Sequence, residues 1–163
     1  MKSLRITMLT GLILLSLVST SFAAVTDKYF RADKQYYDFE NGVHVVTGNI
    51  VINAGTGTIT GEKAQVKLST LEFWGTGGWI LRQNDVTFKG DTAYVVFGQN
   101  MAQIEGNIEF ARPGLQITAD KVDYNWKSKV TTFKGNVKIL QADGGARTAD
   151  SVNYNVKTKE FVN

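Results

Sequence analysis

Acidic side chains recur along this chain at an almost constant interval, and they are the first candidates for chemistry. Successive members of the series are 29 residues apart, with a last interval of 30. Stacked in register, such carboxylates could support general acid–base catalysis or bind calcium through their oxygens. The series consists of Asp33, Glu62, Asp91, Asp120 and Asp150.

The surroundings of these acids favour a structural role over a chemical one. Each acid comes just before an expected strand, where an acidic side chain readily hydrogen-bonds the local backbone. Three of them are followed directly by a lysine, at Lys34, Lys63 and Lys121. We therefore expect turn capping and compensated surface charge rather than catalysis or calcium binding.

The remaining residue types exclude several kinds of site. His44 is the single histidine and there is no cysteine, which excludes a two-histidine metal site, a disulfide framework and a thiolate site. We read His44 as a surface or packing residue. The sequence thus predicts a protein that is not an enzyme, with no catalytic residue, no metal site and no cofactor.

The acids belong to a repeat that runs through the chain. A small residue precedes each of them, and a Gly-Asn pair recurs at the same interval. A fixed period between 20 and 50 residues is typical of stacked supersecondary units. The pairs are Gly48-Asn49, Gly106-Asn107 and Gly135-Asn136, with Gly77-Gly78 at the corresponding place in the second unit.

Between these markers apolar and polar residues alternate, as in strands with one dry face. Val122, Tyr124 and Trp126 share one parity, and Lys121 and Asp123 take the other. One proline and 16 glycines suit a twisted sheet with scarcely any helix. We predict an all-β, repeat-built open jellyroll with an apolar interior. The residues expected to face that interior are Ile50, Ile52, Trp79, Leu81, Ile108, Phe110, Tyr124, Trp126, Val137, Ile139 and Tyr154.

Some positions at the edges of this pattern carry their own predictions. Gln35, Tyr37 and Phe39 are expected to continue the inward column into a partial first unit, whereas Tyr94 and Val96 are expected to place apolar surface outside. Glycine within a strand commonly marks a bulge or a bend, so a bend is expected at Gly48. Asn41-Gly42, Lys127-Ser128-Lys129 and Lys157-Thr158-Lys159 are expected turns.

The first residues predict export. Lys2 and Arg5 precede an apolar run over residues 6–18, and small residues lead to a cleavage site after Ala23. We expect residues 1–23 to be a signal peptide and residues 24–163 to form one domain; a retained membrane anchor is the alternative. Without residues 1–23 the net charge falls from +3 to about +1, which gives no argument for nucleic acid as a partner.

Several units resemble a known repeat. A-D-K-x-x-Y at residues 119–124, T-A-D-S-V-x-Y at 148–154 and T-G-N-I-V-I at 47–52 resemble the OstA-like repeat of the lipopolysaccharide-transport protein A (LptA) family, over essentially the whole chain after residue 23. The resemblance implies a V-shaped β-jellyroll, or β-taco, in the periplasm, whose interior holds the acyl chains of lipopolysaccharide. The eleven inward residues would then be the lipid-binding ones. The Gly77-Gly78 departure implies a distorted second unit.

The resemblance also implies partners. Such proteins join head to tail, and they contact inner- and outer-membrane transport proteins with the same β fold, so that a bridge spans the periplasm. The chain begins and ends inside a repeat unit, which predicts unpaired strand edges that another copy could extend. The expected edge residues are Tyr37, Phe39, Phe161 and Val162.

Four alternatives remain open at this point. The anchored protein C relative has the same fold with a retained N-terminal helix, and protein D carries this domain ahead of a large barrel. A small outer-membrane barrel would need strands of about 9–11 residues across lipid, longer than the three-member apolar columns seen here. A carbohydrate-active enzyme on a β-solenoid would need carboxylates clustered in a groove. The pattern also leaves open whether the interior is a groove or a packed core.

Overall fold

The computed structural model describes residues 25–26, 30–54 and 57–162 of the chain. The expected signal peptide, residues 1–23, lies outside the described residues. The described chain forms a 13-stranded antiparallel sheet with one short 3₁₀ turn, η2, at Phe97–Gln99. No helix among these residues is long and apolar enough to cross a membrane. The all-β prediction is confirmed.

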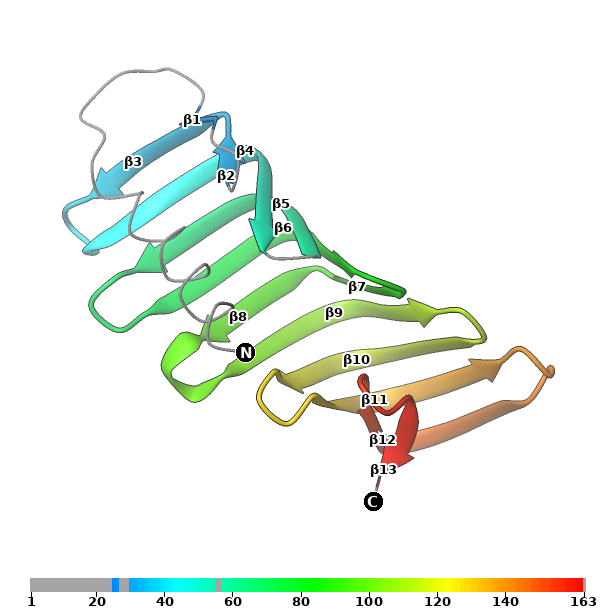
Figure 1. The fold of residues 1–163 in the computed structure, drawn as a ribbon. Coiled ribbons are helices and arrows are strands. Elements are labelled where there is room, and N and C mark those ends of the chain that lie inside the picture. Colours follow the sequence, from blue (N-terminus) through cyan, green and yellow to red (C-terminus); the bar gives the residue numbers. More distant parts are fainter. Residues whose placement is uncertain (1–24, 27–29, 55–56, 163) are drawn as a thin grey trace.

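The strands follow one another as a meander, so that sequence neighbours are also spatial neighbours (Figure 1). The order across the sheet is β1-β2-β4-β5-β6-β7-β9-β10-β11-β12-β13, with β3 paired to β4 and β8 paired to β6 and β9. The strands are β1 Val25–Thr26, β2 Phe30–Ala32, β3 Lys34–Asp38, β4 Val43–Ala54, β5 Gly57–Lys67, β6 Glu72–Gln83, β7 Val86–Gly90, β8 Thr92–Val96, β9 Met101–Arg112, β10 Leu115–Asn125, β11 Val130–Gln141, β12 Ala146–Asn155 and β13 Glu160–Val162.

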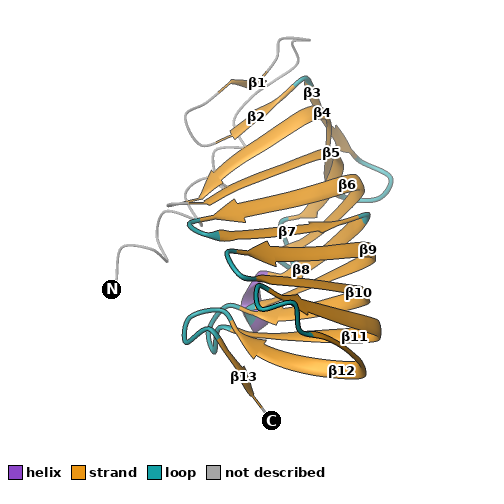
Figure 2. Ribbon diagram, turned by 90° about the vertical axis from the view of Figure 1, so that its right-hand side faces the viewer, coloured by secondary structure: helices purple, strands orange, loops and turns teal. Residues whose placement is uncertain are grey.

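The long strands bend midway, and the bends divide the sheet into two arms. In β4 the pairing with β5 shifts register between Thr47 and Ile50, at Gly48-Asn49, as the glycine predicted. We call the part that contains β3 and β8 the first arm and the part that contains β2 and β7 the second arm, because these short strands pair with opposite halves of β4, β6 and β9. Figure 2 shows the strands stacked along the molecule.

Inward side chains of the two arms pack against each other. In one core cluster, Phe110 and Ile139 of the second arm meet Phe133 and Tyr154 of the first arm. A second cluster, nearer the N-terminal end, joins Val46 and Phe73 of the first arm to Ile50 and Trp79 of the second. The alternation therefore produces the apolar interior that it predicted, and side chains pack it.

The predictions for the partial first unit and for Tyr94 have different outcomes. Phe39 was expected to face inward, but it is 88% exposed in the β3–β4 turn, and Tyr37 is 42% exposed. The alternation stops where the chain turns at Asn41-Gly42, since Gly42 N–H already bonds the Asp38 carbonyl over 2.8 Å. Tyr94 does face outward, where its ring stacks on Trp74.

Candidate functional site

The acidic series lies at the bends between the arms, where Asp33 and Asp91 come directly before β3 and β8 as the sequence pattern predicted, whereas the other three acids lie within strands. The Asn49 side-chain amide donates to the Asp33 carboxylate over 2.8 Å, and the Asp33 N–H donates to the Gly48 carbonyl over 2.9 Å. Asp91 with Asn107 and Asp120 with Asn136 repeat the side-chain bond, each over 2.7 Å. Each of these acids therefore caps the bulge 16 residues further along the chain, which fits the expected capping role.

The neighbouring charges are arranged differently from the expectation. Lys121 pairs with Glu105 over 3.1 Å rather than with Asp120 beside it. Glu62 lies within β5, Asp120 within β10 and Asp150 within β12. In the described part of the chain, no three His, Cys, Asp or Glu side chains gather where a metal ion could be held.

The second unit keeps the bend without the asparagine. Gly77 and Gly78 have φ values of +86° and +85°, and the register of β5 with β6 shifts at Glu62 as it does at the other corners. Space is open where a Gly78 side chain would stand. A shallow groove of about 510 Å³ lies over this corner, and its lining mixes the charged residues Arg31, Lys89 and Asp91 with apolar ones such as Ile80.

The eleven residues expected inside do lie between the arms. Seven are almost completely buried: Ile50, Trp79, Ile108, Phe110, Val137, Ile139 and Tyr154. The other four, Ile52, Leu81, Tyr124 and Trp126, are half-buried.

Aromatic rings connect these positions along the interior. The Phe110 ring lies 4.8 Å from Phe88, 5.5 Å from Phe133 and 5.5 Å from Tyr154, centroid to centroid. Nearer the tips of the first arm, Trp126 lies 6.1 Å from Phe97, and burial raises the pKa of Tyr124. The interior is therefore apolar and aromatic in both core clusters, and in each cluster side chains of the two arms are in contact.

Trp79 shows how closely the walls approach at the corner. Its indole covers Gly61 and Gly75, and a Cβ at either position would collide with the ring. The ring packs edge-on against Phe73 at 5.0 Å, and its buried Nε1 has no hydrogen-bond partner. A hydrogen-bond acceptor of a ligand that reached the Trp79 ring could therefore bond the free Nε1–H of this side chain.

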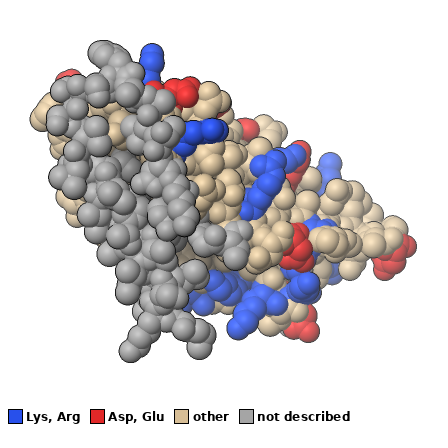
Figure 3. All heavy atoms as spheres, turned by 45° about the horizontal axis from the view of Figure 1, so that its top comes forward, with Lys and Arg blue, Asp and Glu red and all other residues tan. Residues whose placement is uncertain are grey.

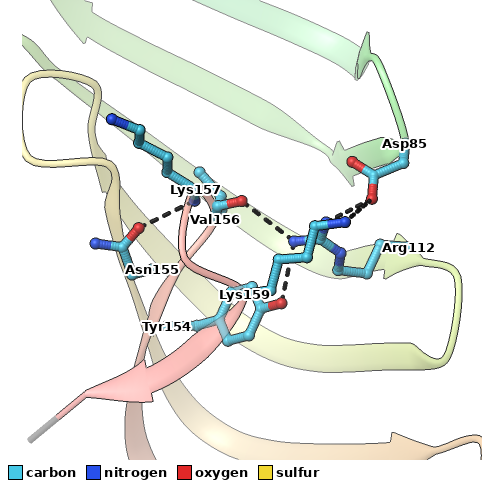
Figure 4. A network of polar contacts seen from close by, with 7 residues as sticks. All are labelled: Asp85, Arg112, Tyr154, Asn155, Val156, Lys157 and Lys159. Atoms are coloured by element: carbon cyan, nitrogen blue, oxygen red, sulfur yellow. Dashed lines mark hydrogen bonds and ion pairs between the residues drawn. The ribbon is translucent and has the colours of Figure 1, made fainter.

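A charged network joins the rims of the two arms, and it was not among the predicted site residues (Figure 4). Arg112 ends β9 in the second arm, and its side chain is 3% exposed. Its Nη1 donates to the Tyr154 hydroxyl over 3.1 Å and to the Val156 carbonyl over 3.2 Å, both in the first arm. Its Nη2 donates to Asp85 in the β6–β7 turn, and Lys159 also donates to Asp85, over 3.3 Å.

The charges in this network stabilise each other. The hydrogen bond from Arg112 holds the pKa of Asp85 below its ordinary value of 3.8, and Lys159 adds to the effect against the opposing influence of burial. Burial disfavours the charged guanidinium, but bonds to Asp85 and Tyr154 outweigh it and raise the pKa of Arg112. The alternation contained a signal for this residue, since Arg112 continues the inward parity of Ile108 and Phe110.

The predicted edge residues lie at opposite ends of the stack. Tyr37 and Phe39 lie at the β3–β4 end, and Phe161 and Val162 lie in β13 at the other (Figure 1). Phe161 is half-buried, with its ring 5.1 Å from Tyr154 and the Arg147 guanidinium 4.1 Å above it. On the face drawn in Figure 3, Lys, Arg, Asp and Glu side chains are scattered among other residues over the part of the surface that is not grey.

Comparison with known proteins finds a likeness in structure and none in sequence. No family model and no curated protein matches the chain. The fold is similar to the crystal structure of LptH from Pseudomonas aeruginosa, described as the LptA-homologous periplasmic component of the conserved lipopolysaccharide transport device. The TM-score is 0.53 at 17% identity, over 74% of this chain and 92% of LptH. The chain therefore has the LptA-like β-jellyroll fold that its repeat motifs predicted.

Proposed function

We propose that this protein binds lipopolysaccharide in the periplasm, shields its acyl chains between the two arms and bridges the inner and outer membranes during lipopolysaccharide transport. The observation that carries the proposal is the apolar interior running along both core clusters of an LptA-like fold. Acyl chains gain about 25 cal/mol for each Å² of apolar surface removed from water. An interior lined by Phe110, Ile139 and Trp126 offers such surface.

The arms are held together by packing and by polar contacts, so acyl chains enter by separating them. Side chains such as Phe133 and Ile139 are almost completely buried in the closed form. In the lipid-bound form the chains take over contacts that the two walls now make with each other. This exchange conserves burial, which keeps the free-energy difference between the two forms small.

The same arrangement supports a binding role without catalysis or a cofactor. Asp33, Asp91 and Asp120 are engaged by the neighbouring asparagines at the corners, where they support the bends. LptH, the similar structure, is a transport component. The membrane partners are, in this proposal, transport proteins with the same β fold.

Head-to-tail contact between copies completes the bridge. In the described part of the chain, β3 pairs on one side only, and the strand order ends at β13. An unpaired strand edge is a ready template for another chain. Joining β13 of one copy to β3 of the next would continue the first arm and its inward column.

Site-specific photo-crosslinking tests the lipid proposal. A photoreactive amino acid at Trp126 or Ile139 should crosslink lipopolysaccharide in cells. The same group at outward-facing Asp123 or Lys138, within three residues of these positions in sequence, should not. Equal labelling of inward and outward positions would show that the interior is only a packed core and would reject the proposal.

A further inference from the structure

We propose that Arg112 and Lys159 form a binding site for the phosphate of an amphiphilic ligand, at the seam where the two arms meet, and that Asp85 occupies this site in the closed form. The proposal rests on the proposed function, because it assumes that the apolar part of the ligand lies between the arms. It assigns the anionic part of the same ligand to named residues.

The burial of the network indicates a built site rather than a surface ion pair. The Arg112 side chain is 3% exposed, whereas Asp85 is 37% and Lys159 is 63% exposed. A buried guanidinium is costly unless an anion and hydrogen-bond acceptors accompany it. The Arg112 guanidinium therefore lies inside the protein, whereas the Asp85 carboxylate that balances its charge is in contact with solvent.

Its position matches the place where the head of an amphiphile would lie. Arg112 lies two residues beyond Phe110 on the inward face of β9, at the rim of the second arm. Across the seam its partners are Tyr154 and Val156 of the first arm. An acyl chain lying against Phe110 would therefore bring a polar head to the guanidinium.

The chemistry of the donors favours phosphate. A guanidinium presents its N–H groups as a planar fork that matches two phosphate oxygens, and an ammonium adds a point charge. Here both cations converge on one carboxylate, since Arg112 Nη2 and Lys159 Nζ contact the same Asp85 oxygen. A phosphate monoester provides more oxygens and more negative charge than this carboxylate does.

The position of Asp85 would allow an arriving phosphate to displace its carboxylate from the two cations. It lies in the short turn between β6 and β7, after Asn84 at a φ of +52°, and its carboxylate already faces solvent on one side. Displacement would break the Lys159–Asp85 contact that joins the rims. The phosphate would then take the place of Asp85 between Arg112 and Lys159, and the two cations would hold the head at the seam.

Binding of matched amphiphiles tests the site. We would titrate the protein with dodecyl phosphate, with a neutral dodecyl glycoside of the same chain length and with inorganic phosphate, following tryptophan fluorescence and calorimetry. Dodecyl phosphate should bind about tenfold more tightly than the neutral amphiphile, and this preference should fall at least severalfold in Arg112→Gln and Lys159→Gln. Asp85→Asn should strengthen dodecyl phosphate binding severalfold.

Lys157→Gln is the matched control. Lys157 lies in the same turn as Lys159, but its side chain points away from Asp85 (Figure 4), so the preference should be unchanged. If Arg112→Gln does not fold, Lys159→Gln and Asp85→Asn still decide the matter.

The outcomes separate this site from the proposed function. Equal binding of both amphiphiles by the wild type would overturn the phosphate site and leave the apolar interior intact. Failure of the neutral amphiphile to bind would count against the interior itself. Inorganic phosphate binding as tightly as dodecyl phosphate would mean a simple anion site without a lipid role, and an unchanged Asp85→Asn variant would mean that Asp85 does not occupy the site.

Discussion

Asn107 in β9 donates its side-chain amide over 2.7 Å to the carboxylate of Asp91, the acid of the same repeat unit 16 residues earlier. Asn107 has a φ of +48°, a left-handed conformation that asparagine tolerates better than most residues. The bond therefore connects neighbouring strands of the sheet at the point where the sheet turns from one arm into the other. Equivalent bonds at Asn49 and Asn136 make this connection a property of the repeat.

Removing that amide should weaken the sheet by a small, measurable amount. Asn107→Gly keeps the backbone conformation, as Gly78 does naturally in the second unit, and deletes only the side-chain bond. We expect a loss of roughly 0.5–1.5 kcal/mol in the free energy of unfolding, measured by urea denaturation. An unchanged free energy would mean that the backbone bulge alone holds the corner.

The second corner allows the reverse experiment. Gly78 has open space at the position of its missing side chain, and Glu62 stands where the other units of this type have Asp. Glu62→Asp combined with Gly78→Asn should restore a bond worth roughly 0.5–1 kcal/mol, although a side chain at the Gly78 φ of +85° offsets part of this gain through backbone strain. Gly78→Asn alone should be less stable than the double variant because the longer Glu62 side chain fits the amide less well. A double variant less stable than Gly78→Asn would contradict the idea that the corners are equivalent.

The glycine of the pair is required for a different reason. Gly106 has a φ of +78°, and a Cβ there would collide with the Asp91 carboxylate. Gly106→Ala should therefore lose about 2 kcal/mol or more, because the backbone strain alone amounts to roughly 1–2 kcal/mol. Gly98→Ala is the control, since its Cβ would meet open space, and it should stay within about 0.5 kcal/mol of the wild type. Similar losses in both variants would refute the steric explanation.

Much of this architecture was predictable because it is periodic and local. The positions of Gly48-Asn49 and the inward parity of Ile108 and Phe110 follow from spacing alone. Phe39 was misplaced because alternation says nothing about where a strand ends, and the Asp38–Gly42 bond ends it early. Arg112 was missed because its partners, Asp85 and Tyr154, are 27 and 42 residues away in sequence. Which side chains meet across the two arms depends on how the whole sheet twists. The residue pattern of a single strand does not contain that information.

The network of Arg112, Asp85 and Lys159 should make the stability of the fold depend on pH in acidic solution. The pKa of Asp85 is lower in the folded protein than its ordinary value of 3.8, chiefly because of the Arg112 hydrogen bond. A lowered folded-state pKa means that the contribution is complete above the unfolded pKa and is lost as pH falls through the folded value. The difference in melting temperature between wild type and Asp85→Asn should thus be constant from pH 7 to 5 and shrink below about pH 4. A difference that persists to pH 2 would show that Asp85 acts through packing instead.

The final prediction concerns the two ends of the stack. Phe39 is 88% exposed, so Phe39→Lys should fold normally while blocking the β3 end. Val162→Pro should spoil the β13 end, because proline cannot donate to a strand ladder. A head-to-tail contact is heterologous and does not close, so the mass of the wild type in light scattering should rise with concentration, whereas each variant alone should stay monomeric.

Mixing the two variants gives the decisive result. Each variant keeps one intact end, so an equimolar mixture should form dimers and stop there, because both remaining ends are blocked. Met101→Lys, at an exposed position between the two ends, is the control and should assemble like the wild type. Growth beyond dimers in the mixture would place the contact elsewhere on the molecule. A wild-type protein that stays monomeric at high concentration, alone and with its membrane partners, would rule out the bridging role.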